Sequence, residues 1–560
     1  MNSPESNKFW KRYEQGIDYI RKKSLVNRTN RCWNFYAGKQ WEGLQSGNEE
    51  LPFLNFIKPT IKHKVSTVSQ NNMVANYSDA EGREELADFY KRCNTMFSAC
   101  WERANEDLEL WATMKEAAVT GDGIQYFGTE DVGDMQRIPN TSVLYGDESQ
   151  PNIQLQPYII IHERLPVGVI KRMAKENRLP QDKIDQIVSD QEMENFVGNR
   201  DEVEENSKSD EAKATCIIHF EKKDGIVYVA RATRSVVFQP EKAIAVTNPD
   251  GSMGTGLTLY PLVKISWEDY PNSARGLSEV EQLIPNQLEI NKTLARRSMI
   301  IKLTAYPRIA YDGTVITNPE DLDKVGVPIE MQSGGVQSIN QAIAYLNPAQ
   351  SNSDPKNYAD DLLSLSQELS GSGETSMGNI NPNRVAASAI IAIRDQAALP
   401  LNEQVAKMKT FVEDMARLWI EMWAVYNPNG MDVLVEKTDE LTGEKYQELE
   451  KMSKKDFDAM KPDIRVDTSQ DNPWTKEAEQ NWLDNVLEKQ YITFEEYIKV
   501  SPDHGIVPKN KMESLMEERK AEEQRQMAME GGMLQQTEGE AMAQATAAWE
   551  EQDGNQQETM

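Results

Sequence analysis

Apolar positions recur at helical spacing in the middle of the chain and predict three helices. The first begins near Leu277 and runs past Ile301. In the second, over 356–370, apolar residues spaced 4, 3 and 4 apart fall on one helical stripe. The third has a stripe that alternates steps of 3 and 4. The stripes of the last two helices are Tyr358, Leu362, Leu365 and Leu369, and then Val405, Met408, Val412, Met415, Trp419, Met422 and Tyr426.

Two segments without helical periodicity separate these helices. The first has three prolines among short apolar runs, which indicates a small irregular insert. The second, 371–384, contains three glycines and three asparagines and almost no apolar residue. Taken alone, it is either a plain linker or a flexible functional loop. Pro400 follows it and is expected to kink or interrupt the next helix, because proline lacks a backbone donor.

The chain before residue 276 predicts helices followed by short strands. An amphipathic helix is expected over 5–30, and a long helix over 84–118 that stops at the glycines of Gly121-Asp-Gly123. A further helix is expected over 164–177. Runs rich in β-branched and aromatic residues predict strands at 124–127, 142–144, 158–161, 215–220, 226–230 and 235–238.

Beyond Tyr426 the pattern becomes more polar. Short strands are predicted at 431–436 and 464–467, with a charged helix over 439–460 between them. Helices at 477–490 and 494–500 follow, and the tail after Arg525 contains no Lys or Arg. That tail lacks the aliphatic density of a core and is predicted to be frayed helix or disorder. A chain of 560 residues is expected to form several subdomains.

The formal net charge of −29 restricts the expected contact with nucleic acid. Tight duplex binding depends on Lys and Arg that neutralise phosphates, so this balance argues against it. The charge is compatible with simple solubility, and also with a protein that surrounds DNA and lets it slide. No apolar window is long enough to cross a membrane, and no secretory signal is expected at the N-terminus.

No catalytic residue, metal ligand or cofactor is predicted. The chain has no P-loop and no GxSxG elbow, and its four histidines and four cysteines are scattered. Gly251-Ser-Met-Gly-Thr-Gly256 has the composition of a phosphate loop without its spacing, and is predicted to be a hairpin turn. Carboxylates are numerous, but no pair stands out as a nuclease site.

Several short motifs, taken in order, resemble the portal proteins of tailed bacteriophages, in particular the podovirus-like head-to-tail connectors. They are Phe35-Tyr-Ala-Gly-Lys-Gln-Trp41, Gly121-Asp-Gly-Ile124, Ile138-Pro-Asn-Thr-Ser-Val143, Gly276-Leu-Ser-Glu-Val-Glu-Gln-Leu with Gln287 and Asn291, and Ala387-Ser-Ala-Ile-Ile391. In the helix that starts at Gly276, the resemblance implies that Gln287 and Asn291 face neighbours. The likeness covers about residues 30–430 and is looser beyond 470.

The resemblance implies an α+β portal fold, mainly helical, with a small β-rich wing and clip in a ring-forming subunit. The implied parts are a wing (1–275), a first stem helix (276–306), a clip (307–350), a second stem helix (351–370), a tunnel loop (371–384), the long wing helix with C-terminal strands (385–470), a helical crown (471–526) and an acidic Gln-rich tail (527–560).

The implied function is a ring, a dodecamer in the family, at one vertex of a capsid. Double-stranded DNA would pass through it without sequence specificity during packaging and ejection. The implied partners are further copies of the chain, the terminase large subunit, tail adaptor or head-completion proteins, and the major capsid and scaffolding proteins. The location would be the virion, and the host cytoplasm during assembly. A structural virion adaptor without a channel is the alternative.

Candidate site residues follow from this resemblance. The tunnel loop offers Ser376, Asn379, Asn381, Asn383 and Arg384 toward DNA. The clip offers Tyr311, Asp312, Asp321, Asp323 and Lys324 for docking of terminase or adaptor. The first stem helix carries four cations that pair with acids of the next subunit, line the channel or form a solvated face: Lys292, Arg296, Arg297 and Lys302.

Overall fold

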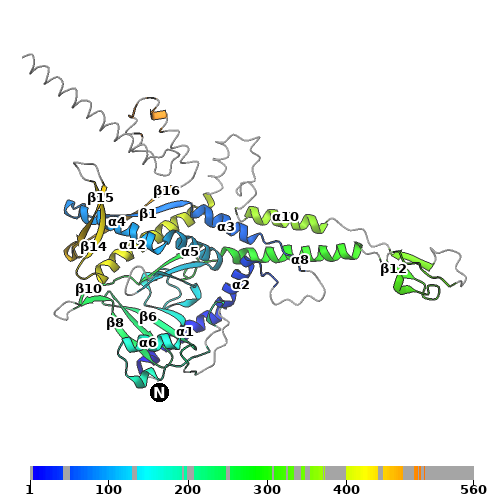
Figure 1. Cartoon of the computed structure of the whole chain (residues 1–560), viewed down its shortest axis with the longest axis horizontal. Coiled ribbons are helices and arrows are strands. Elements are labelled where there is room, and N and C mark those ends of the chain that lie inside the picture. The colour runs from blue at the N-terminus through cyan, green and yellow to red at the C-terminus, as the bar shows by residue number, and fades with distance from the viewer. Residues whose placement is uncertain are drawn as a thin grey trace, which may run out of the picture. The chain divides into compact units, whose positions relative to one another are not determined.

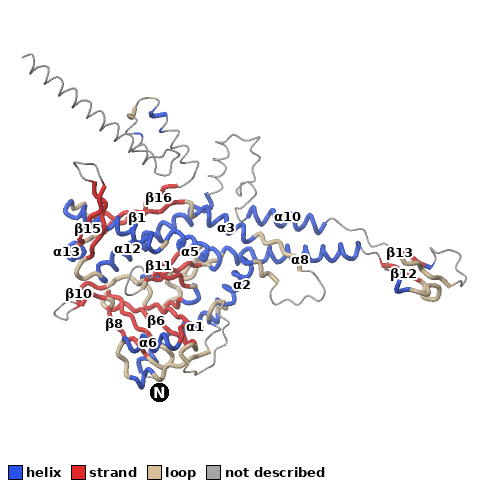
Figure 2. The backbone as a smooth tube through the Cα atoms, in the orientation of Figure 1, coloured by secondary structure: helices blue, strands red, loops and turns tan. Residues whose placement is uncertain are grey.

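The computed structural model divides into two compact units, Met1–Ser469 and Gln470–Met560. It describes residues 4–41, 51–128, 135–191, 195–198, 207, 209–247, 253–305, 308–322, 324, 326–332, 342–346, 354–369, 371, 399–438 and 445–470, with a few residues between 483 and 497. The architecture below is that of the first unit, in which helices and sheets are mixed as an α+β fold requires (Figures 1 and 2). In the second unit, Leu483 and Tyr497 are buried together.

Five helices form the N-terminal part of the first unit. The predicted amphipathic helix is confirmed as α1, but it ends early because Ser24 has a positive φ of 51°. The predicted helix over 84–118 is wrong as one helix, because Asn105 adopts the left-handed conformation (φ 53°) and divides it. The bounds are α1 (Pro4–Lys22), α2 (Leu25–Ala37), α3 (Ile57–Val68), α4 (Ala87–Ala104) and α5 (Glu106–Thr120).

A five-stranded antiparallel sheet has the order β4-β5-β6-β7-β8. Its side chains alternate between two hydrophobic clusters, as the two-residue period of a strand requires. Ile160 and Ile217 pack under α1, whereas Ile161 and Ile218 face the main core. The strands are β4 (Val143–Tyr145), β5 (Tyr158–Pro166), β6 (Lys213–Lys223), β7 (Ile226–Ala232) and β8 (Val237–Ala243).

A second, three-stranded sheet has the order β11-β2-β3. Its strands are β2 (Asp122–Phe127), β3 (Met135–Ile138) and β11 (Leu262–Ser266). The hairpin turn predicted at 251–256 is wrong in its placement, because Met253–Gly256 forms strand β10, which pairs antiparallel with β9 (Ala245–Thr247). The helix predicted over 164–177 is shorter than expected, because β5 continues to Pro166 before α6 (Val167–Glu176) begins; α7 is Gln181–Ile184.

The main core is built around α12 (Asn402–Tyr426), the third helix predicted from the central pattern. Met408, Val412, Met415, Trp419 and Met422 are all buried, so the predicted stripe is confirmed as core. Pro400 lies in the short 3-10 turn Leu399–Leu401 just before α12 rather than within it.

The helix predicted over 439–460 is wrong in its central part. Lys445–Met452 forms β15, which pairs along its whole length with β14 (Met431–Thr438). The alternation of Val433 and Val435, both buried, with exposed Leu434 is typical of a strand. Only α13 (Lys454–Ala459) is helical there, and β16 (Pro462–Gln470) then pairs with β1 (Asn71–Asp79).

Two long helices lie side by side beyond this core (Figure 1). They are α8 (Glu279–Ala305) and α10 (Asp354–Leu369). The segment between them contains the antiparallel pair β12 (Arg308–Tyr311) and β13 (Ile343–Leu346), which agrees with a small irregular insert. None of the described helices combines the length and apolarity that a membrane crossing requires.

We predict that Gly276→Ala destabilises the protein by about 2–4 kcal/mol, because a Cβ there would overlap the backbone. That Cβ would lie 2.6 Å from the carbonyl oxygen of Gly121 and 3.0 Å from that of Glu268. Thermal unfolding of the full chain measures the loss. Gly313→Ala is the control, because a Cβ at Gly313 meets no atom within 4 Å. Equal melting temperatures for the two variants would contradict the prediction.

Candidate functional site

The start of α8 is fixed by a close crossing of two backbones. Gly121, with φ 104°, and Gly276 approach so closely that neither position has room for a side chain. The Gly276 amide donates to Asp122 Oδ1 at 3.0 Å, and Ser266 Oγ donates to the same oxygen at 2.8 Å. Two glycine motifs that are 155 residues apart in the sequence therefore form one junction.

Ser278 caps the first turn of α8. Its Oγ accepts from the Glu281 amide at 3.1 Å, as expected of an N-cap residue. The same hydroxyl donates to the Val119 carbonyl at 2.6 Å, which ties the cap to the end of α5. The Glu281 carboxylate binds the Arg28 guanidinium at 2.8 and 2.6 Å. The direction in which α8 leaves the core is thus set by α2 and α5.

Arg275 anchors the residues just before α8. It is 8% exposed and donates to both Glu148 oxygens, at 2.9 and 2.8 Å. It also donates to the carbonyls of Asn140 and Val143. A buried guanidinium is tolerated when its donors are paired in this way, and the neighbouring Glu148 raises the pKa of Arg275 against the effect of burial.

Gln287 and Asn291 bind the N-terminal part of the same chain. The Phe56 amide donates to Gln287 Oε1 at 3.1 Å, and Gln287 Nε2 donates to the Leu54 carbonyl at 2.6 Å. Asn291 Nδ2 donates to Gln40 Oε1 at 2.5 Å. Both side chains are fully buried, so the neighbours they contact belong to this chain. The contact joins two of the resembling motifs, the Gly-x-Gln-Trp turn and the first stem helix.

Helix α10 returns antiparallel along α8. Asn286, near the start of α8, donates to Ser366, near the end of α10, at 3.1 Å. The contact face of α10 consists of Ala359 and Ser366, with Leu362 and Leu363 half-buried. Of the predicted apolar stripe, Leu362 lies on this face, whereas Tyr358 is 51% exposed and Leu365 is 54% exposed.

Each helix of this pair also has an exposed stripe of defined charge. On α10, Tyr358, Asp361, Leu365 and Glu368 are spaced 3, 4 and 3 apart and exposed, which forms an acidic stripe. On α8, the exposed basic stripe consists of Lys292, Arg296 and Met299. Among the described residues, Lys292, Asp361 and Glu368 have no ion-pair partner, and Arg296 lies 3.6 Å from Glu289.

The four predicted stem cations do not share one side of α8. Lys292 and Arg296 are one turn apart and exposed, whereas Arg297 is half-buried on another side. Lys302 is exposed but is turned away from the first two by the helical period. Spacings of 4, 1 and 5 residues place Lys292 and Arg296 on one stripe of α8, and the contacts of all four cations stay a prediction.

The predicted clip residues lie on the segment between α8 and α10. Tyr311 is 45% exposed at the end of β12. The Asp312 carboxylate accepts from the amide and hydroxyl of Thr314, and these bonds lower its pKa. Lys324 pairs with Asp321 at 2.7 Å. Asp312 and Asp321 thus stabilise local turns, and Tyr311 and Lys324 are both exposed. Asp323 lies outside the described residues.

The predicted tunnel-loop residues lie outside the described residues as well. These are Ser376, Asn379, Asn381, Asn383 and Arg384. Their predicted role stays a prediction. Gly371, the first residue of that segment, has a φ of 69°, which ends the last turn of α10 as glycine favours.

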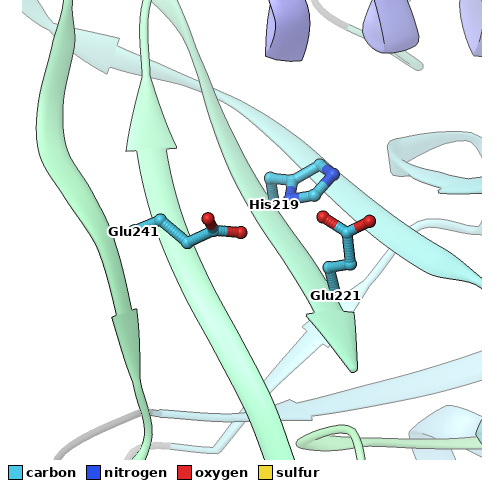
Figure 3. Close-up of side chains that lie close together, drawn as sticks. All are labelled: His219, Glu221 and Glu241. Atoms are coloured by element: carbon cyan, nitrogen blue, oxygen red, sulfur yellow. The ribbon is translucent and has the colours of Figure 1, made fainter. Parts of the chain in front are cut away.

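Three potential metal ligands come together on the five-stranded sheet (Figure 3). The side chains of His219, Glu221 and Glu241 place ligand atoms within 4.8 Å of one another. However, Arg12 Nη1 lies 2.8 Å from His219 Nε2, and a guanidinium can only donate. Nε2 must therefore accept, and Nδ1 carries the proton. Neither nitrogen of His219 is left with a free lone pair for a metal ion.

The charges around this cluster support an ion-pair network. Arg12 binds Glu221 at 3.1 Å, and Lys223 binds Glu241 at 2.5 Å. Burial and the nearby Arg12 lower the pKa of His219 to about 3, so it is neutral at physiological pH. Because the carboxylates are already paired with cations, we interpret the cluster as the contact that holds α1 on the sheet. Sequence reasoning missed it, since Arg12 is 207 residues from His219 in the chain.

We predict that Gln287→Leu destabilises the chain by about 1–3 kcal/mol, because it leaves the buried Phe56 amide without its partner and removes the hydrogen bond to the Leu54 carbonyl. Gln282→Leu is the control, because Gln282 is exposed on the same helix. Urea unfolding followed by tryptophan fluorescence compares the two. A loss no larger than that of the control would mean that the Gln287 contact does not position α8.

The comparisons with known proteins return distant similarity only. No family model and no curated protein matches the chain. One solved structure, the virion of a native gene transfer agent particle, matches with a TM-score of 0.37 and 8% identity, over 84% of this chain and 90% of that chain. The neck of an empty gene transfer agent particle matches with a TM-score of 0.34 and 10% identity, over 78% and 87%. Similarity at this level establishes neither the fold nor the function.

Proposed function

We propose that the chain is the subunit of a portal-type ring that surrounds double-stranded DNA at one capsid vertex. The observation that carries the proposal is the pair of antiparallel helices, α8 and α10, whose exposed stripes have opposite charge. The resemblance of the motifs around residues 35–41, 121–124 and 276–291 to portal proteins supports the same assignment.

The two stripes complement each other only between copies. The basic stripe of α8 and the acidic stripe of α10 both contain exposed apolar side chains, with Met299 at 51% and Leu365 at 54%. Within one chain, α8 and α10 meet through other faces. A second copy that places its acidic stripe on the basic stripe of the first would bury these side chains and pair Lys292 and Arg296 with Asp361 and Glu368.

Such a contact joins two different surfaces. Contacts of this head-to-tail type leave one stripe unused on every added copy, so they generate either an open filament or a closed ring. The fixed junction at Gly121, Gly276 and Arg275 gives every copy the same angle between α8 and the core. A constant angle favours closure into a ring of definite size.

The ring would act as a passive conduit. With a net charge of −29 the subunit offers few cationic contacts to phosphates. DNA would therefore meet only small free-energy barriers as it slides through the ring. The subunit would have no catalytic role, and the terminase would supply the motor. The segment between α8 and α10 would dock terminase and then the tail adaptor, while the N-terminal part would contact capsid and scaffold.

We predict that the purified full chain forms rings with a central hole in negative-stain microscopy, with native mass spectrometry giving one dominant subunit number. The physical reason is the unpaired charge and exposed apolar surface on both stripes. Assembly should weaken with added salt, because exposed charges are screened within about 10 Å at 0.1 M. A chain that stays monomeric at every salt concentration would contradict the proposal and favour the structural adaptor without a channel.

We predict that reversing one stripe disrupts assembly and that reversing both restores it. Lys292→Glu with Arg296→Glu should lower the ring fraction at least tenfold, since acidic surfaces then face each other. Adding Asp361→Lys and Glu368→Lys to the same chain should recover rings. The control is Lys58→Glu with Lys62→Glu, which reverses two exposed lysines one turn apart on α3. Failure of the fourfold variant to recover would place the contact elsewhere.

A further inference from the structure

A buried carboxyl group lies at the corner where α4 ends and α5 begins. Glu106, the first residue of α5, is 0% exposed, and it follows the left-handed Asn105 that separates the two helices. Its side chain meets Gln125 of β2, which is fully buried as well. Glutamate is rarely found fully buried unless it is paired. The partners of Glu106 therefore decide which protonation state the site can hold.

The hydrogen bonds around Glu106 are too few for a carboxylate. Gln125 Nε2 donates to Glu106 Oε1 at 2.6 Å and to Thr113 Oγ at 3.1 Å. Glu106 Oε2 and Gln125 Oε1 are buried and have no hydrogen-bond partner among the described residues. An ionised carboxylate can only accept, and leaving it buried with a single N–H donor is costly. The site holds two acceptor oxygens without a donor, and a proton on the carboxyl group supplies one.

The charges nearest to Glu106 oppose its ionisation. Asp107 and Glu109 act on it, and both are acids of the same first turn of α5. The positive end of the α5 dipole is shared among these three acids, so its effect on the buried one is divided. The guanidinium of Arg137, on β3, binds Glu109 at 2.5 Å instead. No described cation lies within ion-pair distance of Glu106 itself.

The other elements packed on α5 direct their cations elsewhere. From α4, Arg103 donates to a cysteine of its own helix. From α2 and α3, Arg28 and Lys64 bind glutamates of α8. From β11, Lys264 donates to a backbone carbonyl just before α8. A carboxylate at position 106 would therefore be a buried charge without a described counter-ion, which is among the most costly arrangements in a protein interior.

The pKa of Glu106 agrees with this geometry. Burial raises it from 4.5 to about 8 against the hydrogen bond from Gln125, and Glu109 and Asp107 raise it further. A folded-state pKa above the unfolded one means that the folded chain retains its proton to higher pH. The stability that the neutral group contributes is therefore complete below about pH 4.5 and is lost as the pH rises to 8 and beyond.

We propose that the corner between α4 and α5 is a pH-sensitive joint, which is closed while Glu106 carries its proton and loosens when that proton leaves. The change is local, because the Ser278 hydroxyl on the Val119 carbonyl holds the other end of α5 separately. The part of α5 that loosens presents Leu108 and Trp111 to solvent, with exposed fractions of 60% and 44%. The pH would thus change the surface that these two side chains form. The proposal is independent of ring formation.

The test measures hydrogen–deuterium exchange of the full chain at about pH 6 and about pH 9, corrected for the intrinsic pH dependence of exchange. Amide protection over residues 98–112 should fall at least tenfold at the higher pH, because the ionised group opens the corner. In Glu106→Gln, which cannot ionise, protection should change less than twofold. Glu102→Gln is the control, since it removes an exposed carboxylate of α4 just before the corner and should keep the tenfold fall.

Infrared spectroscopy reports on the proton directly. The unaltered chain at about pH 6 should show the C=O stretching band of a protonated carboxylic acid, and this band should weaken by about pH 9. Burial also raises the pKa of Glu116, to about 7, so the readout is the difference between the unaltered chain and Glu106→Gln. Constant protection of the unaltered chain between the two pH values would overturn the proposal. An equal fall in Glu106→Gln, or no difference in the infrared band, would overturn it as well.

Discussion

The close crossing of Gly121 and Gly276 is the constraint on which the rest of the structure depends. A side chain at either position would overlap the backbone of the other. The crossing brings the end of α5, the start of β2 and the start of α8 to one point. Arg275 and Ser278 then hold that point through buried hydrogen bonds to Asn140, Val143 and Val119. A helix fixed so firmly at one end can project a surface at a constant angle.

The proposed assembly of copies depends on the charged side chains that α8 exposes. Gln287 and Asn291 bind α8 to the N-terminal part of the chain, so the first half of the helix is committed to the core. Only the second half, with Lys292, Arg296 and Met299, remains available for another copy. The same division explains why α10, which covers only one side of α8, retains an acidic stripe. Buried polar contacts thus decide which part of the helix is free to assemble.

Sequence patterns predicted the regular elements well where burial is periodic. The amphipathic helix α1 and the stripe of α12 were predicted correctly because their buried positions recur at the helical period. The helix over 84–118 was wrong at Asn105, because a left-handed residue between two apolar runs leaves no mark in their spacing. The helix over 439–460 was wrong because the charged residues of β15 hide its strand period. Lys292 and Arg296 share a side of α8 and Arg297 lies on another, while the contacts of all four stem cations stay a prediction.

The sequence by itself determined the order of elements, the acidic balance and the glycine motifs, because these depend on local periodicity and composition. Only the tertiary structure decided which distant groups meet. The pairing of Gln40 with Asn291, the contact of Arg12 with His219 and the contact of Arg231 with Met173 each join segments more than 50 residues apart. No local sequence pattern predicts these contacts between distant segments. They follow from the packing of whole sheets and helices, which fixes every side chain relative to partners that the sequence does not reveal.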